Sequence, residues 1–475
     1  MRIYNTLSRK KDELKPLEPN KISMYVCGPT VYDYFHVGNA RPFVVYDAFR
    51  RYLTYRGFEV KYVMNLTDVD DKIIKKANEQ GVSASEIAEK YTQAFFEDIE
   101  KLGIKKADYY PRATESIPGM IKLIEILVDK GIAYVVDGDV FYEVAKFKDY
   151  GKLSGKNIED LKSGARIEVD ERKKSPLDFA LWKVAKPGEP YWESPWGKGR
   201  PGWHIECSVM SMSYLGETID IHAGGSDLIF PHHENEIAQS EGATGKPFAR
   251  YWMHNGFLNI EGEKMSKSLG NFFTAREIMK KYHPAVIRMF FLLKHYRSPI
   301  NFSEERIREA QQALQRISTA MENIKLALNE AGAKKIEKNG ELSEAIQHLK
   351  QQAIDELDDD FNTAGALASI FDLVREANLI LNKGALAGTD LYDLSQIKKT
   401  IEEFDQFLGI LSYSESKESS VAEAPLIELL IDVRKKLREA KQWALADEIR
   451  DQLLELGIEL KDRPDKTTWH RRLKS

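Results

Sequence analysis

The sequence predicts an α/β region built on a parallel sheet, with a short insertion, followed by a helical bundle and a small C-terminal domain. Strand-like apolar runs at 22–26 and 60–64 flank a helical pattern whose apolar face holds residues 45, 49, 52 and 53. The two strands of such a β-loop-α-β unit are parallel, because the helix crosses over between them. The stretch 306–412 is nearly all amphipathic helix. A serine-rich, charged stretch at 413–420 then precedes a last helical hairpin.

Length and composition are those of a soluble globular protein. The 475 residues suffice for about three domains, and 43% hydrophobic with 30% charged residues are ordinary values. No apolar run approaches the roughly 20 residues that span a bilayer. The N-terminal Met-Arg-Ile-Tyr-Asn has no apolar signal region. We therefore expect a cytoplasmic protein with no membrane partner.

Charge and cysteine content narrow the possible partners. A net charge of -5 does not indicate a nucleic-acid partner, so any RNA-binding surface must be a local basic patch. The chain has two cysteines, Cys27 and Cys207. In a cytosolic chain, two cysteines favour metal binding or catalysis over a disulfide framework.

The first βα loop is the first candidate ligand site. It reads Cys27-Gly-Pro-Thr-Val-Tyr-Asp-Tyr-Phe-His36-Val-Gly38-Asn39 and lies at the strand edge where open α/β sheets bind ligands. Its glycines allow close approach to phosphate, and a helix that starts near Asn39 presents N–H groups to an anion. His36 adds a donor. Ordinary packing would also explain such a loop, but a second loop far downstream, Lys264-Met-Ser-Lys-Ser268, favours the functional interpretation.

Changes of pattern divide the chain into six segments. A hairpin with the turn Asp137-Gly138, and a loop-rich tract with Trp182, Trp192 and Trp196, interrupt the alternating pattern. This insertion is under a hundred residues long. The segments are the first half of the α/β domain at 1–112, the insertion at 113–200, the second half at 201–258, the segment with the Lys264 loop at 259–305, the bundle at 306–412 and the C-terminal domain at 421–475.

Polar residues lie at the ends of several predicted strands and helices. Thr67 or Asp68 is predicted to cap the helix that follows the second strand, and the block 358–363 is predicted to start a helix with its acidic residues in the first turn. Asp227 follows two glycines at a strand end. It could accept hydrogen bonds from ribose hydroxyls or be an ordinary loop carboxylate.

Four scattered side chains could form a metal site. Both cysteines are expected at strand ends that flank the ligand cleft, and His232 and Glu236 are four residues apart at a helix start, hence on one face. Two thiolates, an imidazole and a carboxylate suit zinc. Alternatively, His232 is a core histidine and Glu236 a surface residue.

The C-terminal region combines basic residues with a tryptophan. Basic side chains follow one another on the predicted outer face of the first hairpin helix, and Trp469 lies in a terminal tail. Charge for the backbone and a ring for stacking are what a reader of single-stranded RNA needs. A solvated charged face is the alternative. The basic residues are Arg434, Lys435, Lys436, Arg438 and Lys441.

These motifs resemble a known enzyme family. His36-x-Gly38-Asn39 is similar to the HIGH signature of class I aminoacyl-tRNA synthetases, and Lys264–Ser268 matches their KMSKS signature letter for letter. Four further blocks, spread from residue 27 to residue 236, resemble the bacterial cysteinyl-tRNA synthetase family: Cys27-Gly-Pro-Thr-Val-Tyr, Gly202-Trp-His-Ile-Glu-Cys207-Ser, Gly225-Ser-Asp227 and Phe230-Pro-His-His-Glu-Asn-Glu236.

The resemblance implies a fold and an activity. It implies a Rossmann-type catalytic domain, a stem-contact segment at 259–305, a tRNA-binding bundle and an anticodon-recognition domain. It also implies that L-cysteine is activated with ATP and Mg²⁺ to cysteinyl-adenylate, releasing diphosphate, and is then transferred to the 3′-terminal adenosine of tRNA(Cys). One zinc ion per chain, held by Cys27, Cys207, His232 and Glu236, would select the substrate thiolate. We expect a monomer.

The same resemblance implies roles for individual residues. His36, Asn39, Lys264 and Lys267 would be catalytic, with Lys264 and Lys267 neutralising the departing diphosphate. The ATP-binding set is Thr30, His36, Gly38, Asn39, Gly225, Asp227, Lys264 and Lys267. The cysteine-binding set is Gly28, Thr67, Trp203 and His222. The tRNA-binding set is Arg434, Lys435, Arg463, Asp465 and Trp469.

Three rival functions share part of this pattern. A cysteine ligase acting on an amino sugar, as in the mycothiol pathway, would have the same active site but should lack the final domain. A non-catalytic paralogue that binds RNA or zinc is disfavoured by the intact His36, Lys264 and Lys267. A small nucleotidyltransferase would lack the length, the second signature and the thiolates.

Overall fold

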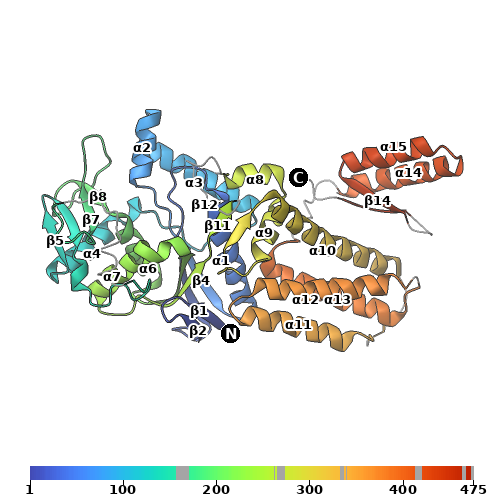
Figure 1. Ribbon diagram of the computed structural model, residues 1–475, viewed down its shortest axis with the longest axis horizontal. Helices are drawn as coiled ribbons and strands as arrows, with labels where there is room; N and C mark the ends of the chain where they lie inside the picture. The colour runs from blue at the N-terminus through green and yellow to red at the C-terminus, as the bar shows by residue number, and fades with distance from the viewer. Residues whose placement is uncertain are drawn as a thin grey trace. The chain divides into compact units, whose positions relative to one another are not determined.

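The computed structural model describes residues 1–156, 171–260, 263–264, 273–331, 336–337, 340–383, 385–411, 420–462 and 467–471 (Figure 1). The chain forms two compact units. Unit 1 comprises Met1–Arg276, His295–Asn301 and Asp358–Phe361, and unit 2 comprises Glu277–Lys294, Phe302–Leu357 and Asn362–Ser475. None of the described helices combines the length and the apolarity needed to span a bilayer.

A four-stranded sheet forms the centre of unit 1, in the order β10-β9-β3-β4. All three strand pairings are parallel, which confirms the predicted class. The strands β9 and β10 are almost fully buried, and β3 and β4 are buried in their carboxyl-terminal halves, as expected of a parallel sheet covered on both faces. The strands are β3 (Lys21–Val26), β4 (Glu59–Met64), β9 (Ile219–Gly225) and β10 (Ala249–Asn255), and the helices that follow them or lie between them include α1 (Val37–Tyr55), α2 (Asp71–Gln80), α3 (Ala84–Lys101), α6 (Trp203–Leu215) and α7 (Glu234–Thr244).

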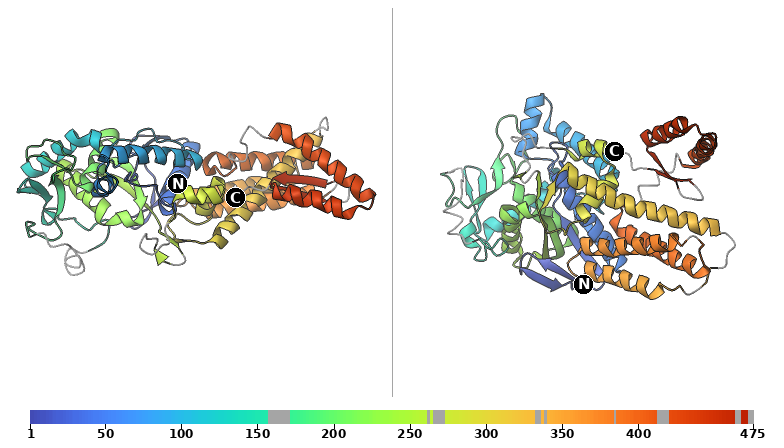
Figure 2. Two further views of the ribbon diagram at one scale, coloured as in Figure 1. Left: turned by 90° about the horizontal axis from the view of Figure 1, so that it is seen from above. Right: turned by 45° about the vertical axis from the view of Figure 1, so that its right-hand side comes forward.

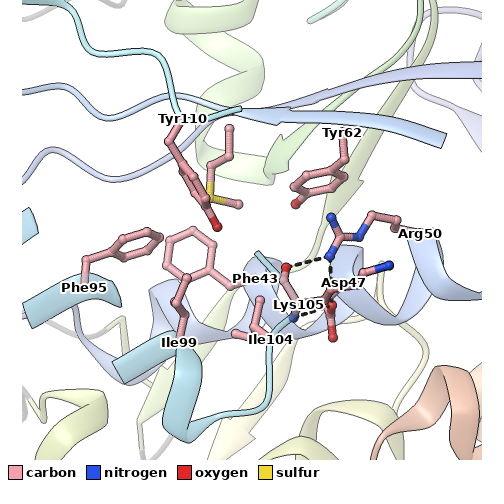
Figure 3. Close-up of a pocket in the computed structure, with 10 residues that line it drawn as sticks. Phe43, Asp47, Arg50, Tyr62, Phe95, Ile99, Ile104, Lys105 and Tyr110 are labelled. Atoms are coloured by element: carbon pink, nitrogen blue, oxygen red, sulfur yellow. Dashed lines mark hydrogen bonds and ion pairs between the residues drawn. The ribbon is translucent and has the colours of Figure 1, made fainter. Parts of the chain in front are cut away.

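The helix α1 is fixed at both ends. At its start, Nδ1 of His36 accepts a hydrogen bond from the Asn39 N–H at 3.2 Å, so His36 is the N-cap and the helix begins at Val37. In its second half, Arg50 donates to the carbonyls of Lys105 and Lys106 at 2.6 and 2.9 Å, and Asp47 accepts from the Lys105 N–H at 3.0 Å. Figure 3 shows the contacts of Arg50 and Asp47 with Lys105 beside a pocket lined by aromatic side chains of α1, α3 and β4.

The helix α2 is capped by a different residue from the two predicted. The side chain of Asp70 accepts from the Lys72 N–H at 2.8 Å. Thr67 is engaged elsewhere, since its hydroxyl donates to Glu206 at 2.8 Å. Asp68 is engaged too, because it accepts from the amide and hydroxyl of Thr114 at 2.9 and 2.6 Å. The prediction of Thr67 or Asp68 as the cap was therefore wrong.

A second, antiparallel sheet forms in the chain between the halves of the first, in the order β5-β6-β7-β8. The predicted hairpin is confirmed: Val136 pairs with Asp139 across a turn whose two residues, Asp137 and Gly138, have φ of 51° and 88°. Trp182 was predicted to lie in a loop-rich tract, but it is a fully buried residue of β7. The sheet packs with α4, which contacts α6 and α7 (Figures 1 and 2). The elements are α4 (Ile117–Asp129), β5 (Ala133–Val136), β6 (Asp139–Tyr142), β7 (Phe179–Val184) and β8 (Gly199–Pro201).

Two smaller sheets and a helix complete unit 1. In the order β12-β11-β13, β11 lies between the strand that ends at Lys264 and a strand from much later in the chain. The helix α8 begins in unit 1 and continues into unit 2. The elements are β1 (Arg2–Asn5), β2 (Lys10–Glu13), β11 (Leu258–Ile260), β12 (Glu263–Lys264), β13 (Ile300–Phe302) and α8 (Ala275–Lys281).

Most of unit 2 is helical, and the helices predicted for 306–412 are confirmed. The helices α10, α12 and α13 pack side by side around buried aliphatic residues (Figure 2). The buried Arg288 of α9 donates to the carbonyl of Leu408 at 2.9 and 3.2 Å. The helices are α9 (Pro284–Leu292), α10 (Glu304–Ala331), α11 (Ser343–Asp358), α12 (Thr363–Leu381), α13 (Gly388–Leu408), α14 (Ser420–Glu439) and α15 (Trp443–Glu455).

The acidic block at 358–363 ends one helix and contains the start of the next, but its acidic residues are not in the first turn of that next helix. The helix α11 ends at Asp358, and α12 begins at Thr363, where Asn362 caps it by accepting from the Gly365 N–H at 3.2 Å. Asp360 and Phe361 have φ of 71° and 48°, in the left-handed region, which no right-handed helix allows. The predicted helix start at the acidic residues was therefore wrong.

The C-terminal residues form a β-hairpin where a tail was predicted. The strands β14 (Ile458–Asp462) and β15 (Thr467–Arg471) pair antiparallel, with Leu460 opposite Trp469. The predicted helical hairpin is confirmed, and Leu430 and Leu456 on its two helices are 38% and 61% exposed. The small core comprises Ile427, Ile431, Leu453 and Ile458.

Candidate active site

Four side chains from three parts of unit 1 meet at the carboxyl edge of the parallel sheet. Cys27 follows β3 directly, and its N–H donates to the Ala223 carbonyl of β9 at 3.1 Å, which holds it in line with the sheet. Cys207 lies in the second turn of α6, not at a strand end as predicted. His232 and Glu236 come from the turn before α7 and from its first turn. All four are buried, with exposures of 8% or less.

The four ligand atoms lie within 4.8 Å of one another. The two sulfur atoms are 3.9 Å apart, Cys27 Sγ is 3.7 Å from Glu236 Oε1, and His232 Nε2 is 3.0 Å from the same oxygen. The spacing of four between His232 and Glu236 therefore brings them together on one face, as predicted. Two sulfur donors, one imidazole and one carboxylate around a common point fit a zinc ion.

Burial and neighbouring groups shift the pKa values of these four side chains, and for all but Cys27 the two effects oppose each other. Burial raises the pKa of the Cys27 thiol well above its usual value, whereas the hydrogen bond from Cys27 lowers the pKa of Cys207 to about 6. Burial opposes ionisation of Glu236, but His222 and His232 outweigh it and lower the Glu236 pKa to about 2. Burial likewise opposes the charged form of His232, and Glu236 with Cys207 raises its pKa to about 10. The cluster thus attracts positive charge.

Further histidines form a buried layer behind these donors. His222 Nε2 is 2.8 Å from the second oxygen of Glu236, and His233 Nε2 is 3.2 Å from the Cys27 sulfur. Cys27, His222, His233 and Glu236 also form a set of potential metal donors. His254 contacts His233 at 2.8 Å, and burial lowers the pKa of His254 to about 3, so it is neutral.

The sequence reasoning missed His233 and His254 as members of the site. The adjacent pair His232-His233 was a signal for the first. His254 could have been placed from its position at the end of β10, the strand beside β9. Neutral imidazoles that contact a ligand set orient the ligands, in the way outer residues of metal sites do.

The residues predicted to bind cysteine surround the cluster. His222 is fully buried on Glu236, whereas Trp203 is 40% exposed and stacks on the His232 ring at a centroid distance of 4.2 Å. The Gly28 N–H donates to Asn65 at 2.8 Å, and the Asn65 amide lies 3.2 Å from the Thr67 hydroxyl. The Thr67 hydroxyl donates to Glu206, the residue before Cys207. These bonds connect the loop that carries Cys27 to the helix that carries Cys207.

The residues predicted to bind ATP lie along the same edge of the sheet. The loop after β3 is joined to the loop after β4, since the Val31 N–H donates to the Thr67 carbonyl at 3.0 Å and Thr30 forms a bridge with Thr67. Asn39 and Gly38 lie in the first turn of α1. Asp227 is exposed, and a Cβ at Gly225 would lie 2.4 Å from its Oδ1, so the glycine leaves room for that carboxylate.

The chain that follows the second signature returns to the first. The Val37 N–H donates to the Phe273 carbonyl at 3.0 Å, and the Ala275 N–H donates to the Phe35 carbonyl at 2.9 Å. The backbone of Lys264 is in β12, but its side chain and all of Lys267 lie outside the described residues. The described ends of this loop are therefore in the same unit as His36.

The residues predicted to bind tRNA have different surroundings. Arg434 is 3% exposed, and both of its terminal nitrogens donate hydrogen bonds to Asp462 at 2.7 and 2.8 Å. This side chain therefore joins α14 to the β14–β15 hairpin. Lys435 is exposed. The Trp469 indole N–H donates to Glu428 at 2.9 Å, and its ring packs on the small core. Arg463 and Asp465 lie outside the described residues.

Three family models match this chain. They are the tRNA synthetases class I (C) catalytic domain over residues 13–312, the DALR domain over 352–412 and the cysteinyl-tRNA ligase anticodon binding domain over 424–469. The first alone covers more than half of the chain.

Curated relatives match over the full length. A cysteine–tRNA ligase of Caldicellulosiruptor saccharolyticus is 53% identical over 471 residues, covering 99% of this chain and all of the relative. The cysteine–tRNA ligase of Carboxydothermus hydrogenoformans is 52% identical over 475 residues, with coverage of 99% and 100%. That of Geobacillus sp. (strain WCH70) is 54% identical, with coverage of 99% of each chain.

Solved structures share the fold. The methionyl-tRNA synthetase of Mycobacterium tuberculosis in complex with methionyl-adenylate has a TM-score of 0.62 at 15% identity, covering 86% of this chain and 94% of that one. An Agrobacterium radiobacter leucyl enzyme in a ternary complex with tRNA has a TM-score of 0.61 at 12% identity, with coverage of 86% and 87%. With both signatures, the buried donor cluster and these matches in place, the chain belongs to the cysteinyl-tRNA synthetase family of class I aminoacyl-tRNA synthetases.

Proposed function

We propose that this chain is a cysteine–tRNA ligase that activates L-cysteine with ATP and Mg²⁺ and then esterifies tRNA(Cys). The observation that carries the proposal is the buried set Cys27, Cys207, His232 and Glu236 at the edge of the sheet where the first signature loop begins. An amino-acid pocket built around sulfur donors has a clear use when the substrate is itself a thiol. The relatives that match over the whole chain carry the same activity in their names.

A metal at this cluster would solve the problem of rejecting serine. Cysteine and serine differ at one atom, and a pocket that uses shape alone rejects such close analogues only about a hundredfold. Zinc, when bound, would supply a Lewis acid for the substrate sulfur and would lower the pKa of the substrate thiol. Selection at this step removes the need for hydrolytic editing, in agreement with the short insertion.

The chain itself holds the ligands in place before the substrate arrives. Glu236 is bound between His222 and His232, and the Trp203 ring covers His232. The bonds from Gly28 through Asn65 and Thr67 to Glu206 set the spacing between the loop of Cys27 and the helix of Cys207. We assign Gly28, Thr67, Trp203 and His222 to the cysteine pocket on this basis.

The activation step needs positioning and charge stabilisation rather than a protein nucleophile. A carboxylate oxygen of cysteine attacks the α-phosphorus of ATP, the bond to the β-phosphate oxygen breaks, and diphosphate leaves. His36 and the first turn of α1 at Gly38 and Asn39 would contact the phosphates, with Thr30 nearby, and Gly225 and Asp227 would hold the adenosine. Lys264 and Lys267 would neutralise the diphosphate, an assignment that rests on the sequence match.

In the second step the 2′-hydroxyl of the terminal adenosine attacks the adenylate carbonyl, and AMP leaves. The family match over 424–469 supports anticodon recognition by the last domain and argues against the amino-sugar ligase. Within that domain we retain Lys435 and Trp469 as tRNA contacts, together with Arg463 and Asp465 from the sequence. We leave out Arg434 because it is buried on Asp462. A cytoplasmic monomer fits this role.

Aminoacylation of total tRNA by the purified full-length protein tests the proposal. Labelled cysteine should enter acid-precipitable tRNA in the presence of ATP and Mg²⁺, and cysteine should drive exchange of labelled diphosphate into ATP. Exchange without tRNA charging, with transfer to glucosamine-type acceptors instead, would support the amino-sugar ligase. Absence of both activities in zinc-loaded protein would support a non-catalytic paralogue.

A further inference from the structure

The segment Asp358–Phe361 belongs to unit 1, although it joins α11 to α12. Two consecutive residues in it, Asp360 and Phe361, have left-handed backbone conformations that residues other than glycine rarely adopt. Such conformations persist only where the surroundings determine them, and they concentrate at functional positions. The contacts of the segment show what holds it.

Asp360 is fully buried and fully bonded. One of its carboxylate oxygens accepts from the Tyr4 N–H and from the Tyr296 hydroxyl, both at 2.8 Å. The other accepts from the Arg297 guanidinium at 2.7 Å. A buried carboxylate is tolerated only with such partners. Asp360 therefore fixes the turn that contains Tyr296 and Arg297.

That turn holds the helix of the first signature. The carbonyls of His295 and Ser298 accept from one nitrogen of Arg41 at 3.3 and 2.7 Å. Arg41 is fully buried and lies in the first turns of α1, two residues after Asn39. Its position, and with it the start of α1, depends on where the turn places these carbonyls.

The same turn holds the base of the strand that leads to the second signature. The other terminal nitrogen of Arg41 donates to the carbonyls of Gly256 and Phe257 at 2.7 and 3.1 Å, and the Gly256 N–H donates to the Tyr296 carbonyl at 2.9 Å. These two residues run directly into β11, which pairs with β12 ending at Lys264.

Two other residues of the segment, Asp358 and Phe361, contact the second half of α1. Asp358 accepts from the Tyr52 hydroxyl at 2.7 Å and forms an ion pair with Arg56. The Phe361 ring is buried against Phe49 at a centroid distance of 5.1 Å. The segment thus contacts α1 directly through its last turns and indirectly through Arg41.

We propose that Asp360 is a positioning residue for adenylate formation, which holds the His36–Asn39 helix start and the base of the Lys264 loop in register through the 295–298 turn. The proposal rests on the proposed function, because the two signatures act together only if ATP is activated between them. The partners of the Asp360 carboxylate among the described residues are Tyr4, Tyr296, Arg297 and His295, and none of them is a predicted metal donor.

The test is cysteine-dependent exchange of diphosphate into ATP by the full-length, zinc-loaded variant Asp360→Asn, with rates normalised to active sites titrated by the adenylate burst. Displacements of about 1 Å can cost a hundredfold in rate, so we expect kcat/KM for ATP to fall about 10- to 100-fold. Zinc content and the KM for cysteine should stay within twofold of wild type. A merely structural role would reduce the number of active sites but not the rate per site.

Asp359→Asn is the matched control. Asp359 is the adjacent acid, it is bonded to Arg2 and Lys11, and it does not contact the turn. Its exchange rate should be that of wild type. If Asp360→Asn does not fold, Tyr296→Phe removes one bond to Asp360 and should give a smaller loss that is non-additive with Arg41→Lys.

Two results would overturn the proposal. Equal rates per site for Asp360→Asn and Asp359→Asn, or additivity of Tyr296→Phe with Arg41→Lys, would show that Asp360 does not act through the turn. Absence of exchange in the wild-type protein would instead remove the proposed function on which it depends.

Discussion

The C-terminal domain should unfold when one exposed aspartate loses its charge. Asp462 accepts four hydrogen bonds from charged or polar partners: two from Arg434 at 2.7 and 2.8 Å, one from Arg438 at 2.8 Å and one from the Thr467 hydroxyl at 2.7 Å. These bonds join α14 to both strands of the hairpin. The substitution Asp462→Asn removes both ion pairs and takes away the carboxylate to which the buried Arg434 is hydrogen-bonded.

The size of the effect follows from burial. Removing one partner of a fully buried ion pair costs about 3–5 kcal/mol. The Asp462 side chain is 41% exposed, and solvent screening reduces the cost, so we expect about 1–3 kcal/mol. A core of four aliphatic residues gives the domain a small reserve of stability. Such a loss would therefore unfold a substantial fraction of the domain at 37 °C.

Hydrogen exchange and enzyme kinetics give the readout. Amide protection in α14 and α15 should fall in Asp462→Asn, and the KM for tRNA in aminoacylation should rise, while cysteine-dependent exchange of diphosphate stays at the wild-type rate. Asp451→Asn on α15, whose contact with Arg450 is a weak 3.4 Å, is the control and should change neither quantity. Unchanged protection and an unchanged KM in Asp462→Asn would refute the reasoning.

Three further predictions concern the active site and pH. Gly28→Ala should abolish cysteine activation, because the added Cβ would lie 1.8 Å from the Asn65 carbonyl oxygen and displace the loop of Cys27; steady-state exchange measures this, and wild-type rates would contradict it. Lys267→Ala should slow exchange with zinc content unchanged, as metal analysis of the same sample would show; an unchanged rate would discredit its role. Arg434 holds the pKa of Asp462 below its ordinary value of about 3.9. The contribution of the Arg434–Asp462 ion pair to the stability of the folded domain is therefore complete above the ordinary aspartate pKa. It is lost as pH falls through the folded-state pKa of Asp462. Amide protection of α14, measured while pH is lowered, should show this loss in wild type but not in Asp462→Asn.

The sequence predicted those parts of the structure that local pattern determines. The parallel strands at 22–26 and 60–64, the hairpin at Asp137-Gly138 and the long helices of unit 2 each carry a periodicity or a turn signal that needs no distant partner. The cluster of Cys27, Cys207, His232 and Glu236 was predicted because a known family supplied the pairing, and His232 with Glu236 because helical spacing does so.

The errors arose where a distant partner decides the local conformation. Asp68 does not cap α2 because Thr114 occupies its carboxylate, and the acids at 358–360 start no helix because Arg56, Lys11 and Arg297 hold them in a turn. Arg434 is not on a solvated face because Asp462 lies opposite it. None of these partners could be found from spacing along the chain.

The central claim is that a metal held by Cys27, Cys207, His232 and Glu236 selects cysteine by its sulfur. The most direct measurement is the zinc content of the purified protein together with the ratio of kcat/KM for cysteine to that for serine in diphosphate exchange. The account predicts one zinc per chain and a ratio well above the roughly hundredfold that shape alone provides, both lost in Cys207→Ala. Zinc-free protein that still prefers cysteine, or zinc-loaded protein that activates serine equally well, would contradict it.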